Sequence, residues 1–146
     1  NLEWGKEGAT DAECNAALKV ACAYDFVAEK GGLEEPVTEG GKNFSGGQKQ
    51  RLTIARAVVG RPKILILDDS ASALDFATDA KLRANIAALE DTTTILISQR
   101  ASSIKNADMI YVMEDGKIAG RGKHEELYKN CPLYREICDS QARAAE

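Results

Sequence analysis

The chain has 146 residues, of which 44% are hydrophobic and 29% are charged, a composition typical of one ordinary folded domain with a core. The net charge of -4 argues against nucleic acid as a main partner, because proteins bind phosphate backbones through clustered Lys and Arg. No apolar run is long enough to span a bilayer, so any membrane role must come through another chain or segment.

The first helix is predicted over residues 11–29. Thr10 and Glu13 have the spacing of a capping box, in which each side chain bonds a backbone N–H of the first helical turn. Apolar residues then recur at helical spacing. Cys14 and Cys22 are predicted to lie more than two turns apart on this one helix, too far for a disulfide, and all four cysteines are expected to be reduced.

A second capping box surrounds a pair of glycines. Ser45 and Gln48 have the required spacing, and they predict a helix over residues 46–59. Gly46 and Gly47 have no Cβ, so a ligand can approach their backbone closely. The exposed N–H groups and the positive end of the helix dipole favour an anion there, with phosphate as the best candidate. The alternative is an ordinary capped helix after a glycine-rich loop.

The second part of the chain has a different pattern, so we place a subdomain boundary between residues 1–60 and 61–146. Residues 64–67 form a continuous apolar run, which predicts a strand buried on both faces of a parallel sheet. A helix over residues 76–89 and a strand over residues 93–98 follow. We therefore expect a right-handed βαβ unit.

The last part of the chain is predicted to hold a β-hairpin and two helices. Strands are expected over residues 109–113 and 117–119, joined by an Asp-Gly turn at residues 115–116. The two helices are expected to begin near Lys123 and near Pro132.

Polar side chains follow the two strands of the predicted parallel sheet. Asp68 and Asp69 end the first strand, and Gln99 follows the second. Ligands of such sheets bind at the carboxyl ends of the strands, and adjacent carboxylates suit Mg²⁺. The alternative is that an Asp only caps the following turn. The order of the phosphate-type helix start, the Asp pair and the segment 72–75, which ends in the helix cap Asp75, favours a nucleotide site.

These motifs resemble those of the nucleotide-binding domain of an ABC transporter of the exporter type. Residues 44–48 resemble the signature motif, whose usual form is Leu-Ser-Gly-Gly-Gln. Residues 64–68 resemble the Walker B strand, residues 72–75 the D-loop, and residues 98–100 the segment that usually carries the switch histidine. Residues 38–41 are similar to the acidic x-loop of exporters, which touches the membrane domain. The resemblance covers nearly the whole chain.

The resemblance implies an α/β fold: a partial RecA-like P-loop NTPase core, with a parallel sheet and flanking helices, preceded by an all-helical signature subdomain. It implies ATP and Mg²⁺ as cofactors, with Asp68 as the metal ligand and with Asp69 and Gln99 at catalytic positions. The nucleotide-binding residues that it implies are Ser45, Gly46, Gly47, Gln48 and Asp75.

The family's phosphate-binding loop is absent from the sequence. No Gly-x-x-x-x-Gly-Lys-Ser/Thr occurs, and in the family this loop and the Q-loop precede the point where the chain begins. We therefore expect the chain to be the C-terminal portion of the domain and a piece of a longer protein. By itself it is predicted to be inactive as an ATPase and to self-associate, because unpaired strand edges invite pairing with another chain.

Two catalytic positions depart from the family pattern. Asp69 stands where a glutamate usually acts as general base, and its carboxylate is displaced by roughly 1.5 Å. A misplacement of about 1 Å can already cost about a hundredfold in rate. Gln99 replaces the switch histidine and cannot carry a positive charge. These departures suggest a degenerate ATP site, whereas the intact residues 45–48 are expected to act in trans on ATP held by a partner.

The implied partners are a second nucleotide-binding domain, in a heterodimeric exporter, and the transmembrane domains of the same transporter. The implied location is the cytoplasmic face of the cell membrane, reached through membrane segments outside this chain. Two alternatives stay open. A soluble ABC-type ATPase acting on ribosomes or DNA would share the motifs, and a non-hydrolysing dimerisation module would explain Asp69 and Gln99.

Overall fold

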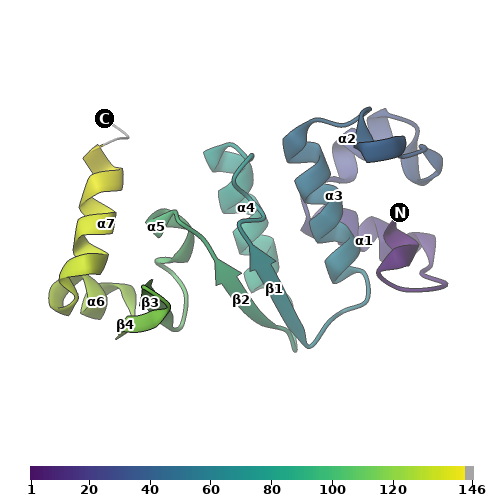
Figure 1. Cartoon of the computed structure of the whole chain (residues 1–146). Helices are drawn as coiled ribbons and strands as arrows, with labels where there is room; N and C mark the ends of the chain where they lie inside the picture. Colours follow the sequence, from purple (N-terminus) through teal and green to yellow (C-terminus); the bar gives the residue numbers. More distant parts are fainter. Residues whose placement is uncertain (144–146) are drawn as a thin grey trace. The chain divides into compact units, whose positions relative to one another are not determined.

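The computed structural model describes residues 1–143, and its contacts divide the chain into two compact units (Figure 1). The first unit is Asn1–Ile97 and the second begins at Ser98. Along the chain the two units meet after the second predicted strand, whereas the sequence pattern places a subdomain boundary between residues 60 and 61. That subdomain boundary stays a prediction.

The α-helices of the first unit are α1 (Asp11–Val20), α2 (Tyr24–Glu29), α3 (Gly46–Val58) and α4 (Phe76–Ala87). Two of them, α1 and α3, begin where the capping boxes predict, and α4 begins after its predicted cap Asp75. At α1, the Glu13 N–H donates to Thr10 Oγ1 and the Thr10 N–H donates to Glu13 Oε2. The two capping boxes are therefore confirmed as pairs of reciprocal hydrogen bonds.

The prediction of one helix over residues 11–29 is wrong in its middle, because α1 ends before Cys22. Cys22 has a φ of 55°, in the left-handed region. The Ala23 N–H donates to the carbonyl of Leu18, and the Cys22 N–H donates to that of Lys19. This is the Schellman pattern, in which glycine usually holds the left-handed position. Cys14 and Cys22 therefore do not share a helix.

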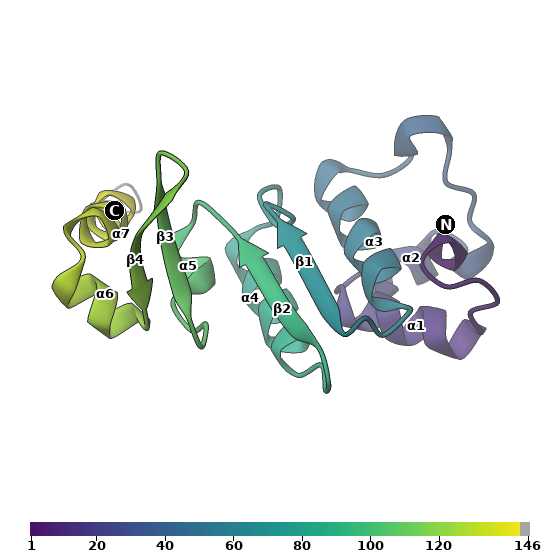
Figure 2. The same cartoon turned by 60° about the horizontal axis from the view of Figure 1, so that its bottom comes forward.

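The predicted parallel strand pair is confirmed. Strand β1 (Ile64–Asp68) pairs in parallel with β2 (Thr93–Ile97), and α4 connects them (Figure 2). Burial of β1 on both faces, however, is not observed. Leu65 and Leu67 are buried, whereas Ile64 and Ile66 are each 61% exposed. The reason is that α4 covers one face of the pair, where Leu65 and Leu67 join the core that includes residues of this helix.

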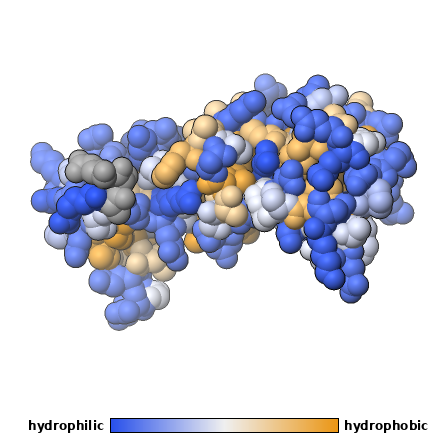
Figure 3. Space-filling model, turned by 90° about the horizontal axis from the view of Figure 1, so that it is seen from above, coloured by the Kyte–Doolittle hydropathy of each residue, from blue (hydrophilic) through white to orange (hydrophobic). Residues whose placement is uncertain are grey.

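One hydrophobic core unites the helices and the strand pair of the first unit. Its largest fully buried apolar side chains come from three helices: Leu18 of α1, Ile54 of α3 and Leu82 of α4. Elsewhere apolar residues reach the surface among hydrophilic ones, as on the face drawn in Figure 3. The core fixes α3 beside the segment that connects β1 to α4, and this segment carries the predicted site.

The second unit contains the predicted hairpin and the two predicted helices. Its elements are α5 (Ala101–Ile104), β3 (Ile110–Glu114), β4 (Lys117–Gly122), α6 (His124–Asn130) and α7 (Pro132–Arg143). The turn residues Asp115 and Gly116 both have positive φ, as a two-residue hairpin turn requires. Strand β4 is longer than predicted and reaches Gly122. The short helix α5 was not predicted.

The remaining sequence predictions concern cysteines and membrane segments. All four cysteines are free thiols, in agreement with the prediction that they are reduced. Among residues 1–143, no helix combines the length and the apolar character needed to cross a bilayer.

Candidate functional site

The first part of the candidate site is the start of α3. The Ser45 hydroxyl oxygen accepts the Gln48 N–H at 3.3 Å, and the Gln48 Oε1 accepts the Ser45 N–H at 2.9 Å. Ser45 and Gly46 are exposed, so solutes can reach the N-terminal end of this 13-residue helix. The arrangement leaves the helix dipole and the first-turn backbone facing solvent, which suits a phosphate group.

Gly47 has a packing role that the sequence analysis did not anticipate. A Cβ at this position would lie 3.0 Å from the carbonyl oxygen of Ala73 and 3.2 Å from Leu74 Cδ2. These contacts are tighter than most Cβ contacts, so a side chain here would push the segment 72–75 away by a few tenths of an ångström. Gly47 therefore favours the close packing of α3 against this segment, whatever it contributes to a ligand.

Two further α3 side chains were missed in the sequence analysis. Gln50 hydrogen-bonds the segment after β1, at Ser72 and Ala73. The Arg51 guanidinium donates to the carbonyl of Cys22 at 2.7 Å and lies 4.7 Å from the ring centroid of Phe26. The spacing offered a signal, because residues three and four positions after Gly47 lie on the same helix face as this glycine.

The second part of the candidate site is the end of β1. Asp68 lies on the exposed face of the strand, in alternation with the buried Leu67. Asp69 is exposed and has a φ of 46°, a left-handed conformation that Asp tolerates better than most residues. Its N–H donates to the carbonyl of Ile97 at 3.0 Å, so the parallel hydrogen bonding continues one residue past the strand.

The donor set at the end of β1 fits Mg²⁺. Asp68 and Asp69 present exposed carboxylate oxygens, and this cation is usually held by one or two carboxylates together with waters and phosphate oxygens. Within residues 1–143, no cluster of three or more His, Cys, Asp or Glu side chains could hold a metal alone. A metal here would therefore need oxygens from a bound phosphate or from water.

Asp75 has a structural role. Its carboxylate accepts the Thr78 N–H at 2.9 Å and the Thr78 hydroxyl at 2.8 Å, and so it caps α4. These hydrogen bonds lower the pKa of Asp75 below its ordinary value, the backbone N–H contributing most. A role of Asp75 in nucleotide binding stays a prediction.

Gln99 belongs to the second unit, and Ser45, Asp68, Asp69 and Asp75 belong to the first. The Gln99 side chain is exposed, and its carbonyl accepts a hydrogen bond from Gln141 Nε2 at 2.6 Å. Gln141 Oε1 in turn accepts the N–H of Ala101 at 2.9 Å. One side chain of α7 thus holds the backbone on both sides of residue 100.

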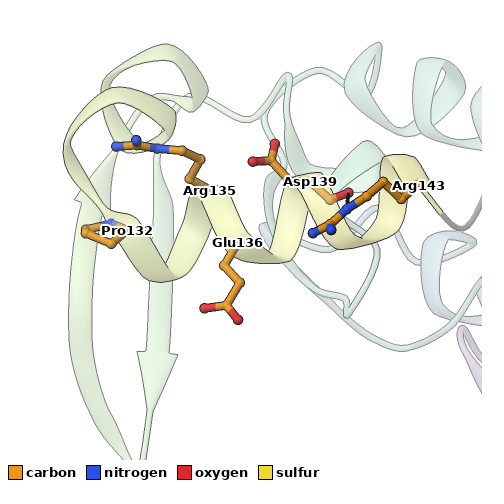
Figure 4. A pocket seen from close by; sticks show the side chains of 5 residues that line it. All are labelled: Pro132, Arg135, Glu136, Asp139 and Arg143. Atoms are coloured by element: carbon orange, nitrogen blue, oxygen red, sulfur yellow. Dashed lines mark hydrogen bonds between the residues drawn. The ribbon is translucent and has the colours of Figure 1, made fainter.

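A shallow pocket lies along α7 in the second unit, and none of its lining residues is a predicted site residue (Figure 4). It is lined by Pro132, Arg135, Glu136, Asp139 and Arg143. The Arg135 guanidinium donates to the carbonyls of Tyr128 at 2.9 Å and Lys129 at 2.8 Å, so it closes the end of α6. The charged Arg135 side chain therefore stabilises the end of α6.

Comparison with known proteins agrees with the resemblance of the motifs. The family profile described as ABC transporter matches residues 6–72. An uncharacterized ABC transporter ATP-binding protein of Mycobacterium tuberculosis (strain ATCC 25618 / H37Rv) is 46% identical over 149 residues, which cover 99% of this chain and 25% of the relative. This chain belongs to the ABC transporter family.

Two further similarities are to an exporter and to a multidrug resistance protein. The solved structure of a bacterial Atm1-family ABC exporter with ATP bound superposes with a TM-score of 0.92 at 40% identity, covering 97% of this chain and 25% of that chain. A probable multidrug resistance ABC transporter ATP-binding/permease protein of Bacillus subtilis (strain 168) is 45% identical over 143 residues, covering 97% of this chain and 24% of the relative. This ABC transporter chain thus spans about a quarter of these relatives' length, and its fold is that of part of an exporter-type nucleotide-binding domain.

Proposed function

We propose that this chain is part of the ATP-binding and ATP-hydrolysing subunit of an ABC exporter, where it couples ATP binding and hydrolysis to transmembrane transport. The observation that carries the proposal is the capped and exposed start of α3 at Ser45, which lies next to the segment following Asp68 and Asp69. The likeness to the Atm1-family exporter supports the exporter type.

In this proposal the start of α3 acts in trans. The signature residues 45–48 complete an ATP site whose other half lies on a second nucleotide-binding domain. Phosphoryl transfer depends mainly on positioning and charge stabilisation, so an intact helix start can serve a partner's ATP even where its own chain hydrolyses slowly. The first-turn N–H groups, aided by Ser45, would contact the phosphates.

The chain's own ATP site is proposed to be the slow one. Asp68 would hold Mg²⁺, which supplies charge neutralisation to the bound phosphates. Asp69 has a shorter side chain than the family's glutamate, and Gln99 can hydrogen-bond a phosphate but cannot protonate. The proposed assembly is a heterodimer of nucleotide-binding domains at the cytoplasmic face of the membrane, attached to transmembrane domains.

The test compares Ser45→Arg with Asp69→Asn in the full-length transporter. We expect Ser45→Arg to abolish ATP turnover, because it removes the cap and places a cation at the positive end of the helix dipole. Asp69→Asn should change turnover little. The control is Thr10→Arg, which removes the equivalent cap of α1 and should leave turnover near that of the unmodified protein.

The opposite ranking of these two variants would contradict the action in trans. A soluble ATPase of the same family would instead show turnover that responds to ribosomes or DNA. If the assembled protein associates in an ATP-dependent way but never hydrolyses ATP, it is a dimerisation module and the proposed activity is wrong.

A further inference from the structure

The side chain of Gln50 joins α3 to the segment between β1 and α4. Its Nε2 donates to the Ser72 hydroxyl oxygen at 3.1 Å, and its Oε1 accepts the N–H of Ala73 at 3.1 Å. Both ends of the amide are therefore used by the same segment. A planar group held at both ends fixes the distance and the orientation between the two elements.

The connection continues from Ser72 to Asp69. The Ser72 hydroxyl donates to the Asp69 carbonyl at 3.1 Å while its oxygen accepts from Gln50. Two side-chain hydrogen bonds thus link the backbone of Asp69 to α3. Because the hydroxyl has a single proton, the donation to Asp69 requires that Gln50 be the donor at the other end.

The same segment is held against α3 by shape. Ala73 lies so close to Gly47 that a Cβ there would be 3.0 Å from the Ala73 carbonyl oxygen. Leu74 is buried in the core of the first unit. The segment therefore packs closely against α3, and Gln50 adds two hydrogen bonds to this packing.

We propose that Gln50 is a positioning residue that makes the start of α3 and the backbone after Asp69 move together. The inference rests on the proposed function, under which residues 45–48 face a partner's ATP while Asp68 and Asp69 face the chain's own. Gln50 would then connect the two ATP sites within one chain. Its removal would let the helix start shift relative to the segment, without removing any group that touches nucleotide.

Hydrogen–deuterium exchange in the full-length protein tests the connection itself. Gln50→Ala should speed exchange of the Ala73 amide, which loses its acceptor. Thr53→Ala is the matched control: Thr53 is exposed on the same helix, its hydroxyl donates to the backbone of Lys49, and its loss should leave the Ala73 amide unchanged. Unchanged exchange in Gln50→Ala would overturn the proposal.

Turnover tests the consequence for ATP hydrolysis. Gln50→Ala should lower kcat between about tenfold and about a hundredfold, as expected for a misplacement of up to about 1 Å, with the KM for ATP nearly unchanged. Gln50→Glu keeps the acceptor for the Ala73 N–H and loses the donor to Ser72, so it should recover part of the rate. A rise in KM with constant kcat would contradict a positioning role.

A double-mutant cycle tests whether Gln50 and Ser72 affect turnover through the same chain of hydrogen bonds or independently. If Gln50 and Ser72 act through one chain of hydrogen bonds, Gln50→Ala combined with Ser72→Ala should be no slower than the slower single variant. Additive losses would overturn the inference. Failure of the proposed function is distinguishable, because the unmodified protein would then lack turnover while the exchange measurement would still report the Gln50 contact.

Discussion

Cys22 ends α1 in a backbone conformation that glycine usually takes. The sequence offers no glycine at this point, so the helix was predicted to continue. The left-handed residue is instead held by tertiary partners: the Cys22 carbonyl accepts from Arg51, 29 residues away, and Asn85 Nδ2 lies 3.5 Å from its sulfur. Hydrogen bonds from distant residues offset the strain that a side chain incurs there.

Glu13 is the residue whose ionisation is most clearly tied to the fold. Its hydrogen bond from Lys6, followed by that from the Thr10 backbone, lowers its pKa from 4.5 to about 2. Because the folded pKa lies below the unfolded one, the stabilisation is complete above about pH 4.5 and is lost as the pH falls towards 2.

We therefore expect Glu13→Gln to be less stable than the unmodified protein near pH 6 and the difference to shrink as the pH approaches 3. Thermal unfolding across this range measures the difference. Glu7→Gln, at an exposed carboxylate nearby, is the control and should show a much smaller pH dependence of the difference. A difference that grows on acidification would contradict the assignment.

At the scale of elements, α4 supports α1 through one amide. Asn85 Nδ2 donates to the carbonyls of Lys19 at 3.2 Å and Val20 at 3.1 Å, which are among the last carbonyls of α1. The last carbonyls of a helix have no partner within it, and here the Lys19 carbonyl also accepts the Cys22 N–H from beyond the helix end. The side chain thus caps a helix that is distant in sequence, and it joins a helix that precedes α3 in the chain to one that follows it.

Asn85→Ala should lower the free energy of unfolding by about 1–2 kcal/mol, since the partly buried Val20 carbonyl loses this donor. The Lys19 carbonyl, in contrast, keeps the Cys22 N–H. Asn85→Asp should cost more, because a carboxylate has no N–H to donate and would face carbonyl oxygens. Urea unfolding measures both. Lys81→Ala, at an exposed position one turn earlier, should change stability little. An unchanged free energy of unfolding in Asn85→Ala would show that the donor is unimportant.

At the scale of the whole molecule, one face of the strand pair is apolar and open. Ile64 and Ile66 are each 61% exposed, and Ile95 and Ile97 are each 47% exposed. Ile66 and Ile95 are register partners. Ile64 precedes this pair on the same face of β1, and Ile97 follows it on the same face of β2, so the four form a diagonal apolar row. Self-association of the polypeptide, first predicted from unpaired strand edges, gains a second physical reason from this face.

The 146-residue polypeptide, prepared alone, should therefore self-associate in a concentration-dependent way when examined by light scattering. Ile66→Lys should weaken the association, because a charge cannot be buried in an apolar interface without a partner. Ala84→Lys adds the same charge at an exposed position of α4 and should have little effect. A monomer at all concentrations would contradict the prediction.

The same polypeptide should show no ATP turnover, because its sequence contains no Gly-x-x-x-x-Gly-Lys-Ser/Thr loop to hold the phosphates. A phosphate-release assay measures this. The comparison is the turnover measured after a complete nucleotide-binding domain is added as partner. Turnover by the polypeptide alone would contradict the prediction, because it would require a different nucleotide site from the one proposed.

The sequence by itself determined the features whose partners are close in the chain. The capping boxes at Thr10 and Ser45 join residues three apart, and the hairpin turn at Asp115 joins neighbours, so spacing alone encodes their hydrogen bonds. The family motifs were equally visible, because the signature and Walker B segments are each a short run of consecutive residues.

Only the tertiary structure decided where α1 ends, that β1 is covered on one face, and that Gln50 holds the segment after Asp69. Each depends on groups far apart in sequence: Gln50 and Ser72 are 22 residues apart, and Asn85 and Lys19 are 66 apart. Spacing cannot encode such partners, because their distance is set by the packing of the helices and strands and not by the chain between them.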